Sequence, residues 1–214
     1  MVLYPAMILK GSQRGGGRLL ARHLLNTDQN DHVELHEIRH LAGTNLHAAL
    51  QEVEVVSKGT RCRQPFFHVS FNPPQEASLR DGQFEKAFAA VEKKFGLEDQ
   101  PRAVVFHEKN GRRHAHVVWS RIDTEKMRAV QLSHSHLKLG DVSLSLFHEF
   151  GLEPPKGLLN RKHRNPDNFD RKTWQQAKRI GEDPRDLKQV IRESFEKAES
   201  VASFRQSLQS HGLF

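Results

Sequence analysis

The chain has 214 residues, enough for one folded domain of ordinary size with a small additional segment. Its 33 lysines and arginines outnumber its 26 acidic residues, and the net charge of +7, with 14 histidines besides, favours a polyanionic partner such as nucleic acid. The single cysteine excludes a disulfide framework and a cysteine-built zinc site, and no apolar run has transmembrane length, so we expect a cytoplasmic protein with no membrane segment.

The first half of the chain alternates predicted strands with predicted helices. Apolar alternation indicates strands, and apolar residues every three or four positions indicate helices. On these patterns we expect strands over residues 2–9, 32–38 and 64–72, and helices over 18–26, 45–58 and 84–95. The predicted order of elements is thus strand and helix, three times over.

A glycine-rich segment, residues 11–18, follows the first predicted strand. Its three successive glycines would let the backbone approach a ligand closely, and Arg14 and Arg18 lie beside them. The Lys-Ser/Thr pair of a nucleotide-binding loop is missing. Two interpretations stay open, a loop that faces DNA and a plain connection between strand and helix.

The strongest local pattern is Asn110-Gly111 between two apolar, β-branched runs, residues 104–119. Asn-Gly between such runs is typical of a two-residue β-hairpin turn. This register places His107 opposite His114, and His116, two residues further on, shares their face. Three imidazoles would then converge, which suits a divalent transition metal with positions left open for substrate. We favour a catalytic metal site over a surface hairpin that is merely rich in histidine.

The faces of the predicted strands agree with one another. Val33, Leu35 and the apolar residues of the later strands can all lie on one side, covered by helices. The opposite side collects polar residues, namely His68, Ser70, His107, His114, His116 and Ser120. We therefore predict an α+β fold with an antiparallel sheet of about five strands and helices packed on one face.

The remainder of the chain is predicted to be mostly helical. A second His-x-His, residues 134–136, abuts a predicted helix over 137–150 and lacks a third ligand on a paired strand, so we expect a DNA-contacting or exposed loop there. The predicted domains are a core over 1–157, a basic linker over 158–172 and a small helical appendage over 173–214.

The His-x-His motif, with a further histidine on the neighbouring strand, resembles the third motif of the relaxase/mobilisation nucleases of the HUH endonuclease superfamily. The order of predicted elements resembles the relaxase core. This resemblance implies metal-dependent nicking of single-stranded DNA at an origin of transfer in the bacterial cytoplasm, with a covalent 5′-phosphoryl adduct that begins conjugative mobilisation of a plasmid or integrative element. It also implies Mn²⁺ or Mg²⁺ as cofactor and accessory relaxosome proteins as possible partners.

Several site residues follow from the resemblance. In relaxases the first helix carries the nucleophilic tyrosine, and here His23, which points with the apolar stripe of that helix toward the sheet, occupies the corresponding place. Some members of the family use histidine, so the resemblance selects His23, with Tyr4, His32 or His36 as alternatives. It also marks Ser70 as the second-motif serine, near the DNA backbone.

Further site residues are suggested by charge and position. Arg112 and Arg113, beside the hairpin turn, join Arg14 and Arg18 as expected DNA contacts. A carboxylate hydrogen-bonded to a metal-bound histidine would orient its ring, and Glu34 and Glu37 are candidates between which the sequence does not choose.

Two other functions compete with the relaxase. Rolling-circle initiators and transposases share the histidine site, but they usually place their nucleophile after it, and no tyrosine follows His116. A non-catalytic DNA-binding protein that keeps the fold is the alternative from another class, since Tyr4 is the only tyrosine. Many relatives continue beyond a comparable endpoint, so the chain can be a fragment of a longer protein.

Overall fold

The computed structural model describes residues 7–28, 30–73, 79–163, 169 and 171–213. It divides into two compact units, Met1–Leu159 and Asn160–Phe214. Among the described residues, no helix combines the length and the apolar character needed to cross a membrane.

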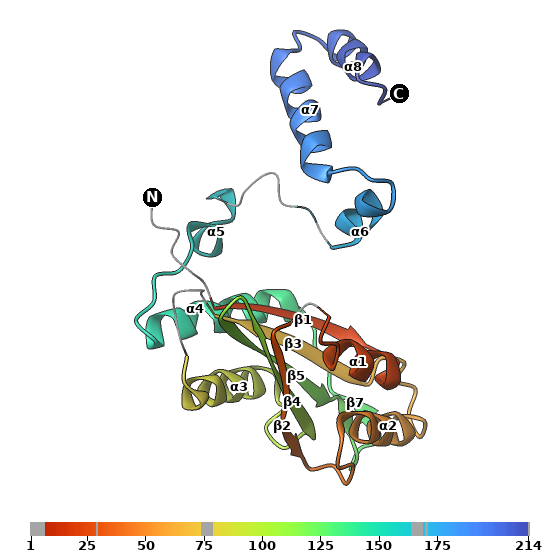
Figure 1. Ribbon diagram of the computed structural model, residues 1–214, viewed down its shortest axis with the longest axis vertical. Coiled ribbons are helices and arrows are strands. Elements are labelled where there is room, and N and C mark those ends of the chain that lie inside the picture. The colour runs from red at the N-terminus through yellow and green to blue at the C-terminus, as the bar shows by residue number, and fades with distance from the viewer. Residues whose placement is uncertain (1–6, 29, 74–78, 164–168, 170, 214) are drawn as a thin grey trace. The chain divides into compact units, whose positions relative to one another are not determined.

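The first unit is built on a five-stranded sheet with the strand order β1-β3-β5-β4-β2, in which every neighbouring pair is antiparallel (Figure 1). Its strands are β1 (Ile8–Arg14), β2 (His32–Arg39), β3 (Phe66–Asn72), β4 (Arg102–Lys109) and β5 (Arg112–Ser120). Its helices are α1 (Gly17–Leu24), α2 (Leu46–Ser57), α3 (Asp81–Phe95), α4 (Ser135–Glu149) and the short α5 (Lys156–Leu159). A small separate hairpin joins β6 (Ile122–Asp123) to β7 (Arg128–Ala129). The predicted α+β class with five antiparallel strands is confirmed.

One face of the sheet carries the larger core. Aromatic and branched side chains of β3, β4 and β5 pack there against α3 and α4, and they include Phe67, Val69, Phe71, Val104, Phe106, Val117 and Trp119. Trp119 is fully buried and is among the largest such side chains. Burial of side chains of this size supplies most of the driving force for folding.

Helices also cover part of the second face, which corrects the prediction that only one face would be covered. Phe66, Val105 and Val118 form a smaller core with α1 and α2, and Figure 1 shows these two helices on the side of the sheet away from α3. The second face is therefore apolar at one end of the strands and carries the histidines at the other. Alternation within the three central strands located this face correctly but did not reveal that its apolar end needs cover.

The edge strand β2 was assigned to the wrong side of the sheet. Val33 pairs with His107 and Leu35 with Val105, so both residues lie on the second face and pack on the smaller core. A register shift between Leu35 and Glu37 then brings Glu37 opposite Val104, on the α3 side. Alternation in a half-buried edge strand indicates two faces without saying which is which.

Half of the predicted glycine-rich loop is strand. β1 continues through Arg14, and only Gly15 and Gly16 separate it from α1, with Gly16 at a φ of 75°. A Cβ at Gly11 would meet Leu139 of α4 at 2.5 Å, so this glycine permits the close packing of α4 on β1 rather than a flexible loop. Residues 2–6 of the predicted first strand lie outside the described residues.

The second unit contains a 3₁₀ turn, Arg161–His163, and the helices α6 (Arg171–Arg179), α7 (Pro184–Lys197) and α8 (Val201–Ser210). Asp183 caps α7 by accepting a hydrogen bond from the Arg185 backbone, with Pro184 at the first helical position. Ser200 caps α8 in the same way.

Candidate metal centre

The β4–β5 hairpin has the predicted turn and register. Asn110 and Gly111 form the turn, with φ values of 51° and 70°, the left-handed conformation that this turn type requires. The pairing sets His107 directly opposite His114 and Val105 opposite His116. The local sequence therefore determines which side chains share this part of the sheet.

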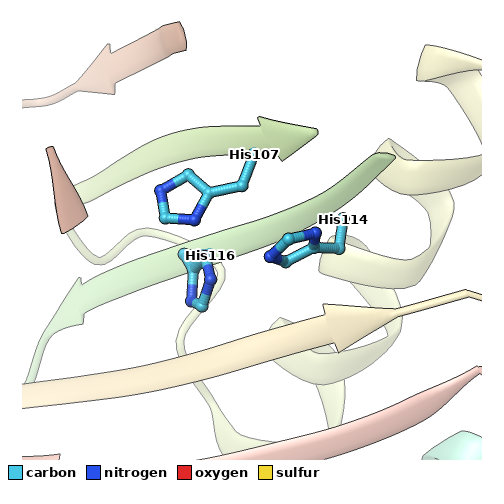
Figure 2. Close-up of side chains that lie close together, drawn as sticks. All are labelled: His107, His114 and His116. Atoms are coloured by element: carbon cyan, nitrogen blue, oxygen red, sulfur yellow. The ribbon is translucent and has the colours of Figure 1, made fainter. Parts of the chain in front are cut away.

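His107, His114 and His116 form one cluster, shown in Figure 2. One ligand atom from each ring lies within 4.8 Å of the others. The ring centroids are 4.5 Å apart for His107 and His116, 5.3 Å for His107 and His114, and 5.2 Å for His114 and His116. His107 and His114 are buried, and His116 is half-buried. Three donors so placed could hold one metal ion.

Neighbouring groups determine which ring nitrogens are available. The Nε2 of His107 lies 2.6 Å from the backbone carbonyl of Leu24, at the end of α1. A carbonyl only accepts, so Nε2 donates and the Nδ1 of His107 is left as a ligand atom. The Nδ1 of His116 lies 3.0 Å from the Nε2 of His68, which leaves the Nε2 of His116. Sequence reasoning placed His68 on this face without a role, and nothing in a sequence indicates a backbone carbonyl such as that of Leu24.

The surroundings keep the three rings neutral. Burial, followed by the charges of the neighbouring histidines, lowers the pKa of His116 to about 2. Burial, followed by the charges of His107 and Arg112, lowers the pKa of His114 to about 4. Burial also lowers the pKa of His107, against the hydrogen bond to Leu24. A metal must compete with protons for imidazole nitrogen, so neutral rings are ready to bind it.

The residues present fit a divalent metal ion. The donor set is three neutral imidazoles, and the Nδ1 of His114 is one of two buried side-chain atoms in the described part of the chain without a hydrogen-bond partner. A buried polar atom without a partner lowers the stability of the fold, and a metal ion coordinated by Nδ1 of His114 would remove that cost.

Neither expected carboxylate supports the cluster. Glu34 pairs with Phe106 in the ladder and lies 3.7 Å from Arg113, on the α3 side of the sheet. Glu37 binds Arg102, also on that side. The suggestion that Glu34 or Glu37 orients a metal-bound histidine is therefore wrong.

The candidate nucleophiles lie in different places. The expectation that His23 points toward the sheet with its apolar stripe is wrong, because His23 and Leu19 are both exposed on α1. The charge of His23 still contributes to the lowered pKa of His116. His32 pairs with Glu108, on the α3 side of β4, and the ring of His36 packs edge-on against Phe106 on that side. Tyr4 lies outside the described residues. Of the described candidates, only His23 accompanies the cluster.

Ser70 lies beside the cluster on β3. It pairs with His116 in the ladder, and its hydroxyl accepts a hydrogen bond from the Asn72 amide at 3.0 Å. The hydroxyl proton therefore remains available to donate to an acceptor in front of the sheet.

The four arginines expected to bind DNA do not lie together. Arg112 shares the histidine face, and Arg14 lies opposite Phe66 on the same face, where its Nε donates to Ser12. Arg18 is exposed on α1 beside a hollow lined by residues of α2. Arg113 projects from the other face, where it pairs with Asp81 and lies over the Phe106 ring.

The comparison with protein families identifies the family to which the chain belongs. A family model described as "Relaxase: MobA/VirD2-like, nuclease domain" matches residues 23–152, from His23 through the histidine hairpin to just beyond the end of α4. The chain belongs to the relaxase family. This relaxase domain is thus a DNA-binding, DNA-nicking nuclease domain of a family that uses a divalent metal, and its three-histidine cluster could hold one. No curated protein matches the chain significantly.

Proposed function

We propose that this relaxase nicks one strand of single-stranded DNA at an origin of transfer, forming a covalent adduct that begins mobilisation of a plasmid or integrative element. The observation that carries the proposal is the cluster of His107, His114 and His116 in a relaxase nuclease domain, with His23 beside it. The proposed location is the bacterial cytoplasm, with accessory relaxosome proteins as further partners.

The three clustered histidines are the proposed metal ligands, with Mn²⁺ or Mg²⁺ as the ion. When bound, the ion supplies positive charge to the non-bridging oxygens of the scissile phosphate, which become more negative in the transition state. The residues around the cluster hold the three rings neutral and turn them toward one another. The open side of the site is the face from which the DNA would approach.

His23 is the proposed nucleophile. An imidazole nitrogen of His23 attacks the phosphorus, a P–N bond forms, and the bond from phosphorus to the 3′-oxygen breaks. The 3′-oxygen takes up a proton in place of the one that the imidazole loses, and it leaves as a 3′-hydroxyl. The DNA then remains on His23 through its 5′-phosphate, as a phosphoramidate that the 3′-hydroxyl can attack to rejoin the strand.

Ser70 and three arginines are proposed to hold the DNA backbone. Ser70 would donate its hydroxyl proton to a phosphate oxygen, since its hydroxyl oxygen already accepts a hydrogen bond from the Asn72 amide. Arg14, Arg18 and Arg112 would contact neighbouring phosphates. We leave Arg113 out of this set because its guanidinium is engaged on the other face.

The test is adduct formation on candidate transfer-origin oligonucleotides with Mn²⁺. The label belongs on the 3′ end of the DNA, because the segment that carries the 5′-phosphate stays on the protein. The His23→Ala protein should form no adduct yet keep metal and DNA binding. His36→Ala is the matched control, a histidine on the other face, and it should react normally.

The chemistry of the adduct separates the candidates. A phosphohistidine is labile in acid because protonation makes imidazole a good leaving group, whereas a phosphotyrosine survives. Tyr4→Phe should therefore change little. An acid-stable adduct that disappears in Tyr4→Phe would assign the reaction to Tyr4 instead. DNA binding without cleavage of any oligonucleotide would support the non-catalytic alternative.

A further inference from the structure

A fourth histidine, His68 on β3, is in direct contact with the cluster. Its Nε2 lies 3.0 Å from the Nδ1 of His116, and the two rings are stacked with centroids 5.2 Å apart and planes 28° apart. His68 pairs with Val118 in the ladder, so it reaches His116 diagonally across neighbouring strands. Only 7% of its surface is exposed. His68 is thus built into the sheet beside the site.

This contact determines which nitrogen of His116 can face a metal. Nδ1 is taken up by His68, so His116 can offer only Nε2. A neutral imidazole that coordinates through Nε2 carries its hydrogen on Nδ1, and that hydrogen must find an acceptor. The unprotonated Nε2 of His68 is such an acceptor when the His68 ring carries its own hydrogen on Nδ1.

No carboxylate serves this purpose in the described part of the chain. Metal-binding histidines usually donate their second N–H to a carboxylate, a carbonyl or water. His107 has the carbonyl of Leu24. No hydrogen bond or ion pair found in the described residues joins a carboxylate to the cluster, since Glu34 and Glu37 lie on the far face of the sheet.

We propose that His68 is a positioning residue for the metal site, which accepts the Nδ1–H of His116 and thereby fixes the tautomer and the ring orientation in which His116 binds the ion through Nε2. This inference rests on the proposed function, in which the cluster holds a divalent metal. His68 itself is not a ligand in this arrangement, because the Nε2 that faces the cluster is the atom that accepts from His116.

The experiment compares Mn²⁺ binding by calorimetry in the full chain and in two variants of His68. In His68→Gln, the side-chain oxygen can still accept from His116, so affinity should stay within about threefold of the original protein. In His68→Phe, the ring shape is kept but the acceptor is lost, and affinity should fall about 10–100-fold, as for other losses of a partner behind a metal ligand. His36→Phe, a ring on the other face, is the control and should bind normally.

Each outcome decides the proposal. Unchanged affinity in His68→Phe overturns it, and so does an equal loss in His68→Gln and His68→Phe, the result expected if His68 coordinates the ion itself. Pulsed EPR of the bound Mn²⁺ tests whether His68 coordinates the ion. The number of coordinated nitrogens should be the same with and without His68 if it is not a ligand. If His68→Phe does not fold by circular dichroism, His68→Leu replaces it, and a tenfold loss in His68→Gln alone overturns the proposal.

Failure of the metal site itself would look different. If the original chain does not bind Mn²⁺, or if His107→Ala binds as tightly as the original, the proposed function is wrong at its metal centre. If His107→Ala loses binding while His68→Phe keeps it, the metal site stands and only the role of His68 is refuted.

Discussion

Replacing Glu92 by alanine tests how the sheet is held to α3 behind the histidine face. Glu92 is 5% exposed, and its Oε1 accepts hydrogen bonds from Trp119 Nε1 at 2.8 Å, Arg39 Nη2 at 2.7 Å and Arg102 Nη1 at 3.1 Å. Arg102 also binds Glu37 and Glu85. One carboxylate thus joins α3 to three strands of the sheet.

The expected cost can be worked out from these partners. Removing one partner of a buried ion pair usually costs about 3–5 kcal/mol. Both arginines keep other acceptors, whereas the indole N–H of Trp119 is left buried and unpaired, which by itself costs about 1–3 kcal/mol. We therefore expect Glu92→Ala to lower the free energy of unfolding by about 3 kcal/mol. Glu92→Gln keeps an acceptor for Trp119 and should cost about 1 kcal/mol.

Urea unfolding measures this difference. The chain has two tryptophans, and in a Trp174→Phe background the fluorescence of Trp119 reports on the first unit alone. Glu85→Ala is the control, because Glu85 also pairs with Arg102 but its side chain is half-exposed. This substitution should lower the free energy of unfolding by less than about 1 kcal/mol. If Glu92→Ala costs no more than Glu85→Ala, with an unchanged dependence on urea, the reasoning is refuted.

Three further predictions concern the hairpin, pH and DNA. Gly111→Val should lower the free energy of unfolding by about 1–2 kcal/mol, measured by urea unfolding, because a branched residue is strained at a φ of 70°. The metal-free protein should lose thermal stability as pH falls from about 6.5, the ordinary pKa of histidine, toward 4, because His114 takes up a proton in the unfolded chain but stays neutral when buried. His114→Phe should lessen this loss, and the same pH dependence of thermal stability in the variant would contradict the prediction. Replacing Arg14 and Arg18 by alanine should reduce the salt dependence of single-stranded DNA binding by about one unit of slope per lost phosphate contact, whereas the same change at Arg113 should not.

The sequence was most informative where structure is local. The Asn110-Gly111 turn determines the register of its own hairpin, so the convergence of His107 and His114 followed from counting residues. The side on which Val33 lies could not be derived in this way, because it depends on which strand β2 pairs with. Long-range pairing also decides the partners of Glu37, whose charge is used by Arg102 rather than by a histidine.

The cover over the second face was missed for a related reason. Phe66 and Val105 stand on the same side of the sheet as the histidines, and single-strand alternation makes no distinction between the two ends of one face. Two helices were needed on that side to bury the apolar end. One of these helices, α1, also carries His23 and the Leu24 carbonyl that accepts from His107, so the cover that strand alternation did not predict contributes to the site.

The alternation of β5 gives the hairpin very little tolerance for changes in length. His114 and His116 face the site, while Ala115 and Val117 between and beyond them face the main core. Inserting one residue between the turn and His114 would exchange the two sets, so that the imidazoles would point into the main core and the side chains of Ala115 and Val117 toward the metal site. Natural variation in this hairpin should therefore keep residues that tolerate positive φ at the turn. An alignment of related chains should show single-residue gaps only at the turn, where a longer loop or a bulge can absorb them, and none between the turn and His116.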